Sequence, residues 1–291
     1  FRQKIPAKQL AKISIHGVSE SEKLFIRNIL QLQEGDSLNM EHLQRGYNRL
    51  RTEGNYTNAF PDLIYEPQLG GYHLHLYLQP STRFKLRLGG SFFTPTDHQL
   101  QVGATYSGVN LVAYQTGVSL MRGSFMNQAK LKGRLFFPFK RPLMLEVENN
   151  FMQWELQNNT LSLFSADNRA DVNFDALTFS AAIGTPVFWN GKLSVGYRWQ
   201  NLDDRYFINQ TEPNQPLDET SFIGQSLFLN YRRSTLNHKM YPTEGHSLRV
   251  AANLSRGDET FDSGNDAFLD RQQDHEWAQL SIYWQRYAVI N

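Results

Sequence analysis

The sequence from Phe84 onward is a series of segments in which apolar residues recur at every second position. Residues at i and i+2 share one face of a β-strand, so this pattern predicts strands with one apolar and one polar face. The expected strands are Phe84–Phe92, Gln99–Ser107, Leu111–Leu120, Met126–Phe137, Leu143–Glu155, Val172–Gly184, Lys192–Leu202, Ser221–Thr235, His246–Arg256 and Glu276–Ala288.

The junctions between the later segments alternate between long and short. The long, polar junctions are 156–171, 203–220 and 257–275, and the short ones are 138–142, 185–191 and 236–245. Long extracellular loops at one rim and tight periplasmic turns at the other are typical of a transmembrane β-barrel. We therefore expect a mainly β fold with an antiparallel transmembrane barrel. A soluble β-sandwich is the alternative, but its strands are shorter and its loops need not alternate in length.

Composition excludes several other classes of protein. The mean hydropathy is −0.51, and no apolar stretch approaches the ~20 residues of a membrane-spanning helix. A formal net charge of +1 argues against a nucleic-acid partner, and the absence of cysteine excludes disulfides and thiolate metal sites. The chain begins at Phe1 without an apolar signal segment, so we expect a processed or trimmed piece of a longer protein.

Residues 10–80 follow a different pattern, which predicts a small β-α-α-β-β domain. The expected elements are a strand at Lys12–His16, a helix near Glu22–Leu30, a second helix carrying Leu38, Leu43, Tyr47 and Leu50, and strands at Ala59–Glu66 and Tyr72–Gln79. Gly35 breaks the chain between the two helices, and Gly54 stands where a helix C-terminal cap is expected. About 70 residues suffice for a small core against one face of the sheet.

This order resembles a POTRA domain, the periplasmic module that precedes barrels of the outer-membrane assembly and secretion superfamily. The resemblance rests on "ISIHGVSESEKLFIRNIL", "EGDSLNMEHLQRGYNRLRTEGNY" and "YHLHLYL". The matching glycines are Gly17 after the first strand, Gly35 between the helices and Gly54 after the second helix. The resemblance to a POTRA domain implies a linker at 1–9, a periplasmic POTRA domain at 10–80 and an outer-membrane barrel at 81–291.

Several barrel segments resemble the membrane part of patatin-like phospholipases of the Bacteroidota type. These segments are "FKLRLGGSF", "GKLSVGYRWQNLDDRYFINQ" and "SLFLNYRRSTLNHKMYPTEGHSLRV". The last contains Tyr241, Pro242, Thr243 and Gly245, which match a turn found across the wider superfamily. That junction is either a periplasmic docking or folding element or a plain tight turn.

The resemblance implies that the barrel anchors or exports an N-terminal lipase. The sequence departs from the family in lacking the Gly-x-Ser-x-Gly nucleophile elbow, so we expect no catalytic residue in this chain. The Val-Arg-Gly-Phe-like motif of the superfamily is also missing. The family has sixteen strands, of which about ten are expected here, so the barrel should be incomplete at the C-terminus. Either further strands or another partner would then cover the two sheet edges.

Two other functions stay open. One is a translocase or insertase of the barrel-assembly or two-partner-secretion type, and the other is a passive porin or a structural subunit of an envelope complex. All of these place the chain in the bacterial outer membrane with its N-terminal domain in the periplasm. Outer-membrane lipid is the expected partner, and a homodimer or a larger envelope complex is a further expectation.

The turn at 138–142 allows a register test within one hairpin. A turn centred near residue 140 places Arg134 opposite Glu146 and Lys132 opposite Glu148, with apolar residues opposite each other on the other face. A charged face in lipid would cost ~2–4 kcal/mol per Lys or Arg at the midplane, so we expect these pairs to face a lumen. They form either a transport path for polypeptide or lipid, or only a salt-bridged wall.

His73 and His75 lie two residues apart on one expected strand and should share a face. Two imidazoles at this spacing can bind a metal, but the sequence reveals no third ligand. The favoured interpretation is an exposed or interdomain strand face, and we expect no metal and no cofactor.

Overall fold

The structure is a computed structural model that describes residues 8–52, 55–94, 97–157, 171–187, 191–206, 216–236, 241–264 and 269–288. The chain divides into two compact units. The first contains Phe1–Lys85 with Tyr106–Gln115 and Leu135–Met144, and the second contains Leu86–Thr105, Thr116–Arg134 and Leu145–Asn291. The first unit contains a three-stranded sheet and short segments of a ten-stranded sheet, whose larger part lies in the second unit.

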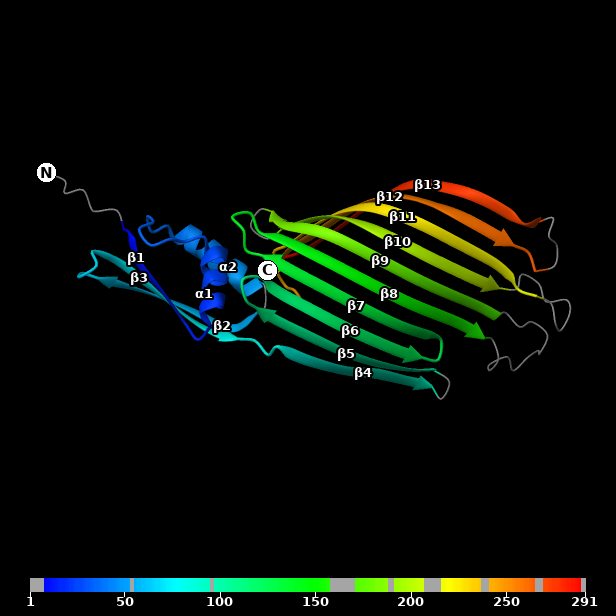
Figure 1. Ribbon diagram of the computed structural model, residues 1–291, viewed down its shortest axis with the longest axis horizontal. Helices are drawn as coiled ribbons and strands as arrows, with labels where there is room; N and C mark the ends of the chain where they lie inside the picture. Colours follow the sequence, from blue (N-terminus) through cyan, green and yellow to red (C-terminus); the bar gives the residue numbers. More distant parts are fainter. Residues whose placement is uncertain are drawn as a thin grey trace. The chain divides into compact units, whose positions relative to one another are not determined.

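The first sheet, which we call the small sheet, has two helices on one face. Its elements are β1 (Leu10–His16), α1 (Glu20–Leu30), α2 (Met40–Thr52), β2 (Tyr56–Glu66) and β3 (Gly71–Pro80). The strand order is β1-β3-β2, with β1 parallel and β2 antiparallel to β3 (Figure 1). This is the element order that the sequence predicts, with each strand or helix starting one to three residues earlier or later.

Helix α1 begins where the sequence supplies a capping box. The Ser19 side chain accepts a hydrogen bond from the backbone N–H of Glu22, and the Glu22 carboxylate accepts one from the backbone N–H of Ser19. These two bonds satisfy donors that the first helical turn leaves without a partner. The helix ends at Gln31, which adopts a left-handed conformation with φ of 54°.

The core of the first unit lies between the helices and the small sheet. Leu74, Leu76 and Leu78 alternate along β3 and are buried against Phe25 and other residues of α1. The remaining buried members of the same cluster are Leu10, Ile13, Ile15, Ile26, Ile29, Leu30, Leu32, Leu43, Leu50, Tyr56, Ala113, Phe136 and Met144.

Two of the glycines singled out in the sequence occupy positive φ in the first unit. Gly17 has φ of +84°, and a Cβ there would lie only 2.1 Å from the carbonyl oxygen of Leu78. Gly35 has φ of +95° in the turn before α2. Both positions favour glycine because side chains rarely adopt this region. Gly54 lies outside the described residues.

The second sheet, which we call the large sheet, contains ten strands in the order β13-β12-β11-β10-β9-β8-β7-β6-β5-β4. The strands are β4 (Phe84–Thr94), β5 (Asp97–Val109), β6 (Ala113–Gly123), β7 (Met126–Phe137), β8 (Leu143–Gln157), β9 (Asp171–Val187), β10 (Gly191–Tyr206), β11 (Asp218–Ser234), β12 (Gly245–Asp262) and β13 (Arg271–Tyr287). Each strand lies beside its sequence neighbours, as hairpins require (Figure 1).

Several strands of the large sheet are longer than the sequence predicts. β10 continues to Tyr206 and β12 to Asp262, into segments that were expected to be long loops. The cause is backbone pairing: Tyr206 pairs with Asp218, and Asp262 pairs with Glu219. The backbone hydrogen bonds between strands do not need apolar side chains, so the strands extend beyond the alternation of apolar and polar residues.

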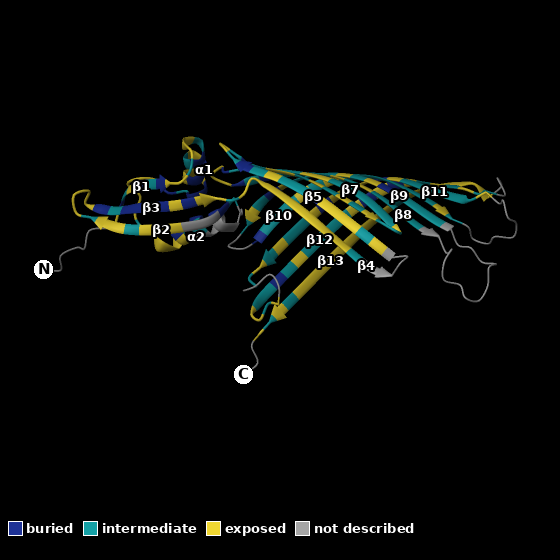
Figure 2. Cartoon of the chain, turned by 90° about the horizontal axis from the view of Figure 1, so that it is seen from below, coloured by how far each residue is buried: buried dark blue, intermediate teal, exposed yellow. Residues whose placement is uncertain are grey.

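One face of the large sheet is apolar and exposed in the isolated chain. Val195 pairs with Ile183 on β9 and Leu229 on β11, and all three are between 46% and 55% exposed. Figure 2 shows β13 mostly as exposed residues. Across the described residues, β4 and β13 are the two edge strands and do not pair with each other. The ten strands therefore form an open sheet rather than a closed barrel. No helix among these residues is long and apolar enough to span a membrane.

Candidate functional site: the polar face of the large sheet

Side chains on the other face of the large sheet are polar and charged. On β10, Ser194 pairs with Gly184 and Asn230, and Arg198 pairs with Ser180 and Ser226. The period of two therefore assigns these residues to one face and the Val195 row to the other. We call this surface the polar face.

A chain of ion pairs crosses four strands of the polar face. Arg134 Nε on β7 lies 3.2 Å from Glu146 Oε1 on β8, and Lys192 Nζ on β10 lies 2.8 Å from Glu146 Oε2. Strand β9 lies between β8 and β10. Lys192 therefore reaches across β9, and Gly184 makes room because a Cβ there would lie 3.1 Å from Lys192 Cε. Glu146 is the shared anion of two cations.

A second carboxylate continues the row on β8. Lys130 Nζ and Lys132 Nζ lie 3.4 and 3.7 Å from the two oxygens of Glu148. The hairpin register expected from the turn at 138–142 thus brings together Arg134 with Glu146 and Lys132 with Glu148 in space. These pairs are 22–51% exposed, so solvent screens them and each contributes little to stability.

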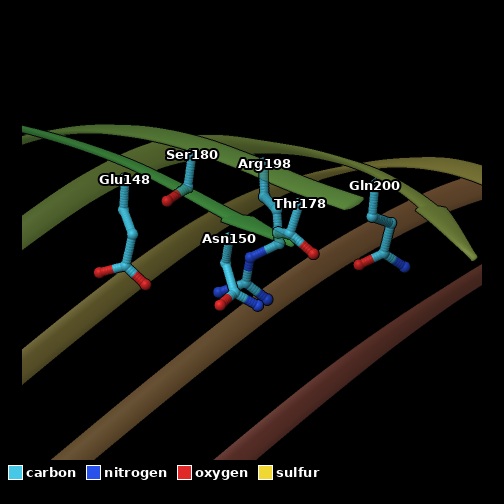
Figure 3. A pocket seen from close by; sticks show the side chains of 6 residues that line it. All are labelled: Glu148, Asn150, Thr178, Ser180, Arg198 and Gln200. Carbon is cyan, nitrogen blue, oxygen red and sulfur yellow. The ribbon is translucent and has the colours of Figure 1, made fainter. Parts of the chain in front are cut away.

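A hollow of about 250 Å³ opens on the same face, lined by Glu148, Asn150, Thr178, Ser180, Arg198 and Gln200. Figure 3 shows these six side chains on the same side of neighbouring strands. Asn150 also accepts a hydrogen bond from Gln128 on β7 at 2.9 Å. The lining offers both donors and acceptors, which suits water and extended polar chains rather than apolar ligands.

Two phenylalanines lie on the polar face above glycines. The Phe228 ring covers Gly196 and lies 5.4 Å from the guanidinium carbon of Arg198. The Phe222 ring covers the paired glycines Gly224 and Gly257. An aromatic ring over a strand glycine shields the bare backbone and fixes register. The aromatic residues here are therefore parts of the polar face despite their apolar side chains.

The turn that carries the superfamily-like sequence precedes β12. Tyr241 has φ of 54° and is 87% exposed, while Gly245 has φ of +108° at the first position of β12. A Cβ at Gly245 would lie 2.4 Å from the carbonyl oxygen of Thr235, so both conformation and space favour glycine there. Pro242 and Thr243 lie between them. This turn precedes β12, whereas the ion pairs lie on β7, β8 and β10, so the two belong to different parts of the fold.

Sequence reasoning missed Lys192, Arg198, Ser180 and the two ring-covered glycine sites. The sequence signal for the ring-covered glycines was the occurrence of glycine and phenylalanine at alternate positions in "SFIGQSLF". Such residues disturb the apolar-polar alternation, and the sequence alone does not indicate which face they occupy.

Comparison with known proteins identifies the family of this chain. Residues 98–268, more than half of the chain, match the model of the Omp85 superfamily domain. The search of curated sequences found no match.

Three solved structures have a similar fold. They are BamA from Haemophilus ducreyi lacking POTRA domains 1–3 (15% identity, TM-score 0.58, 87% of this chain and 51% of that one), CdiB from Acinetobacter baumannii (14%, 0.51, 97% and 54%) and CdiB from Escherichia coli (12%, 0.52, 88% and 51%). The chain therefore spans about half the length of these structures. At this identity the likeness shows the fold, and the matched domain shows the family: the chain belongs to the Omp85 superfamily of outer-membrane β-barrel proteins.

Proposed function

We propose that residues 81–291 form part of the wall of an outer-membrane barrel that handles polypeptide, and that residues 10–80 form its periplasmic POTRA domain, preceded by a linker at 1–9. The polar face then lines a water-filled lumen and the Val195 row contacts hydrocarbon. The observation that carries this proposal is the segregation of ion pairs to one face and exposed apolar side chains to the other.

The small sheet offers a site where an extended polypeptide could bind. The segment 35–38 already bonds to the start of β1, since Gly35 N–H donates to Leu10 O and Leu38 N–H donates to Lys8 O, both at 2.7 Å. Among the described residues β2 pairs only with β3. β2 is therefore an edge strand that can accept another strand by β-augmentation, and Pro61 within it is typical of an edge strand.

The lumen assignment can be tested with single cysteines because the chain contains none of its own. Ser194→Cys lies on the polar face and Val195→Cys on the apolar face of the same strand. In proteoliposomes of the full-length protein, a charged, membrane-impermeant thiol reagent should modify Ser194→Cys and spare Val195→Cys. Equal or reversed labelling would contradict the assignment of the two faces.

Polypeptide binding is tested by crosslinking. A photoreactive benzoylphenylalanine in place of Phe60 on β2 should crosslink to a urea-unfolded outer-membrane protein diluted into the sample. The same group in place of Leu24, which is exposed on α1, is the matched control and should not. Crosslinking at both positions, or at neither, would argue against β-augmentation. A steady, large conductance in planar bilayers would instead favour a passive porin.

A second candidate function rests on the three barrel segments that resemble patatin-like phospholipases. In that case the barrel anchors or exports an N-terminal serine hydrolase, and the intact protein acts on lipid acyl esters. Sequencing the coding region before Phe1 separates the candidates: a Gly-x-Ser-x-Gly domain supports the lipase, and further POTRA repeats support assembly or secretion. A homodimer or envelope complex stays a proposal under either function.

A further inference from the structure

Three histidines and a glutamate gather on the face of the small sheet that points away from the helices. Because Leu74 and Leu76 of β3 are buried in the core, His73 and His75 lie on the opposite face. Ser14 of β1 pairs with His75 in the parallel ladder, which brings His16 to the same surface. All these residues belong to the first unit.

The donor atoms of Glu66, His73 and His75 converge. One ligand atom from each of the three lies within 4.8 Å of the others. Glu66 Oε1 is 2.6 Å from His73 Nδ1, and the His73 side chain is only 7% exposed. We call these three residues the histidine cluster.

His16 lies beside the cluster. Its Nε2 is 3.4 Å from Nδ1 of His75, and the two rings are stacked with centroids 5.7 Å apart. For Zn–N bonds of about 2.0–2.1 Å, two ligands of one tetrahedral zinc ion lie roughly 3.3 Å apart. The separation of these two nitrogen atoms therefore already matches that spacing.

The hydrogen bonds of His73 select one of its nitrogens. Ser14 Oγ lies 2.7 Å from His73 Nε2. When a metal is bound at Nδ1, the Ser14 hydroxyl can accept a hydrogen bond from His73 Nε2–H, so Nδ1, the nitrogen nearest Glu66, is the ligand atom. Outer hydrogen bonds of this kind commonly fix the tautomer and orientation of a metal-binding histidine. The His75 ring packs on the His73 ring with centroids 3.8 Å apart, so these two imidazoles are held side by side.

We propose that Glu66, His73 and His75 bind a divalent transition-metal ion of the zinc class, with His16 as an additional imidazole ligand. Two or three imidazoles and one carboxylate are the ligands that such ions prefer in proteins. On metal binding, Nδ1 of His73 must give up any proton that it shares with Glu66. Bound metal would join the end of β2 to β3 and β1, and thereby stabilise the small sheet.

Calorimetric titration of ZnCl₂ into the full chain, purified in detergent, tests the proposal. The expected result is one strong site per chain. Glu66→Gln keeps a carbonyl oxygen that can still accept a hydrogen bond from His73 but removes the anionic ligand. This variant and His75→Gln should each bind zinc at least about tenfold more weakly.

The matched control is His42→Gln, which removes a histidine of α2 in the same unit and should leave zinc binding unchanged. Cobalt(II) provides a spectroscopic check, because four-coordinate Co²⁺ with nitrogen ligands absorbs visible light strongly. The proposal is overturned if zinc does not bind, or if Glu66→Gln and His75→Gln bind it as the wild type does. Circular dichroism of each variant without metal establishes that weaker binding does not come from unfolding.

Discussion

Phe25, Leu50 and Leu74 in the first unit are at most 1% exposed, whereas Leu254, Leu280 and Ile282 of the large sheet are 63–66% exposed. Both regions contain strands with alternating apolar residues, so the alternation itself does not decide whether a side chain becomes buried. In the first unit, α1 and α2 cover the apolar face of the sheet. In an outer-membrane barrel, lipid covers it.

This comparison shows that the apolar face of a sheet can be covered either by other parts of the chain or by lipid. The first unit carries its own hydrophobic core and resembles a water-soluble domain in this respect. The large sheet has its few buried polar side chains, such as the hydrogen-bonded Ser226 and Ser255, on the polar face. Substitutions at corresponding positions in the two regions should therefore have different consequences.

The largest expected effect is the loss of core packing in the first unit. Phe25→Ala removes a ring that is 0% exposed, and should lower the free energy of unfolding by about 3–5 kcal/mol. Urea unfolding followed by the helical circular dichroism signal is a suitable measurement, since both described helices lie in this unit. Leu24→Ala, at an exposed neighbouring position, should change stability far less; equal losses would mean that Phe25 is not a core residue.

The second effect tests the apolar face of the large sheet. Leu254→Arg, in the central part of β12, should reduce the stability of the membrane-inserted protein by about 2–4 kcal/mol, because the charge meets hydrocarbon. Asn253→Arg places the same charge on the polar face and should cost much less. Folding into liposomes over a denaturant series gives both values. A similar loss of stability for the two variants would contradict the assignment of one face to lipid and the other to the lumen.

A smaller effect is expected at the start of α1. Ser19→Ala removes the side-chain half of the capping box and should destabilise the first unit by ~1 kcal/mol. Glu20→Ala breaks only the exposed pair in which Glu20 Oε1 lies 2.6 Å from Lys23 Nζ, so its effect should be smaller. Thermal unfolding of the two variants ranks them, and a larger loss for Glu20→Ala would contradict the role of the cap.

The smallest effect at neutral pH is expected at Tyr56, whose buried hydroxyl has no hydrogen-bond partner among the described residues. Tyr56→Phe should leave stability unchanged or slightly increased, because no bond is lost. Burial, together with the negative charge of Glu22, raises the pKa of Tyr56 above its ordinary 10.0.

The sign of this shift makes a further prediction about pH. The folded state favours the neutral phenol, so its contribution is fully present below pH 10.0 and is lost as the pH rises toward the folded pKa. The wild type should lose stability above pH 10.0 more steeply than Tyr56→Phe. Parallel alkaline profiles of the two proteins would show that Tyr56 ionises as freely as in the unfolded chain.

The sequence predicts the ten strands and their hairpin order well, because alternation and turn length are local properties. The predicted C-terminal ends of β10 and β12 were wrong because both strands are longer than predicted. Backbone pairing continues through polar residues such as Asp203 and Asp258. The βααββ order was equally accessible from helix spacing and turn glycines. Whether the domain is a POTRA module stays a prediction.

The details of the polar face and the histidine cluster were less accessible. The turn at 138–142 predicts which residues of β7 and β8 are opposite each other, but not that Lys192 joins them from two strands away. That contact depends on the length of a lysine side chain and on the space above Gly184. Likewise, Glu66 becomes a neighbour of His73 only when the β2–β3 hairpin forms, so the sequence showed two possible ligands where the structure shows three.

The bond from Lys192 to Glu146 has a mechanical consequence. It links β8 to β10 across β9, so sliding of any of the three strands would break this ion pair as well as the ladder hydrogen bonds. A shift of β9 by one residue would exchange its two faces and would move Gly184 away from the lysine stem. This part of the sheet should therefore resist shear along the strands slightly more than it would by backbone pairing alone.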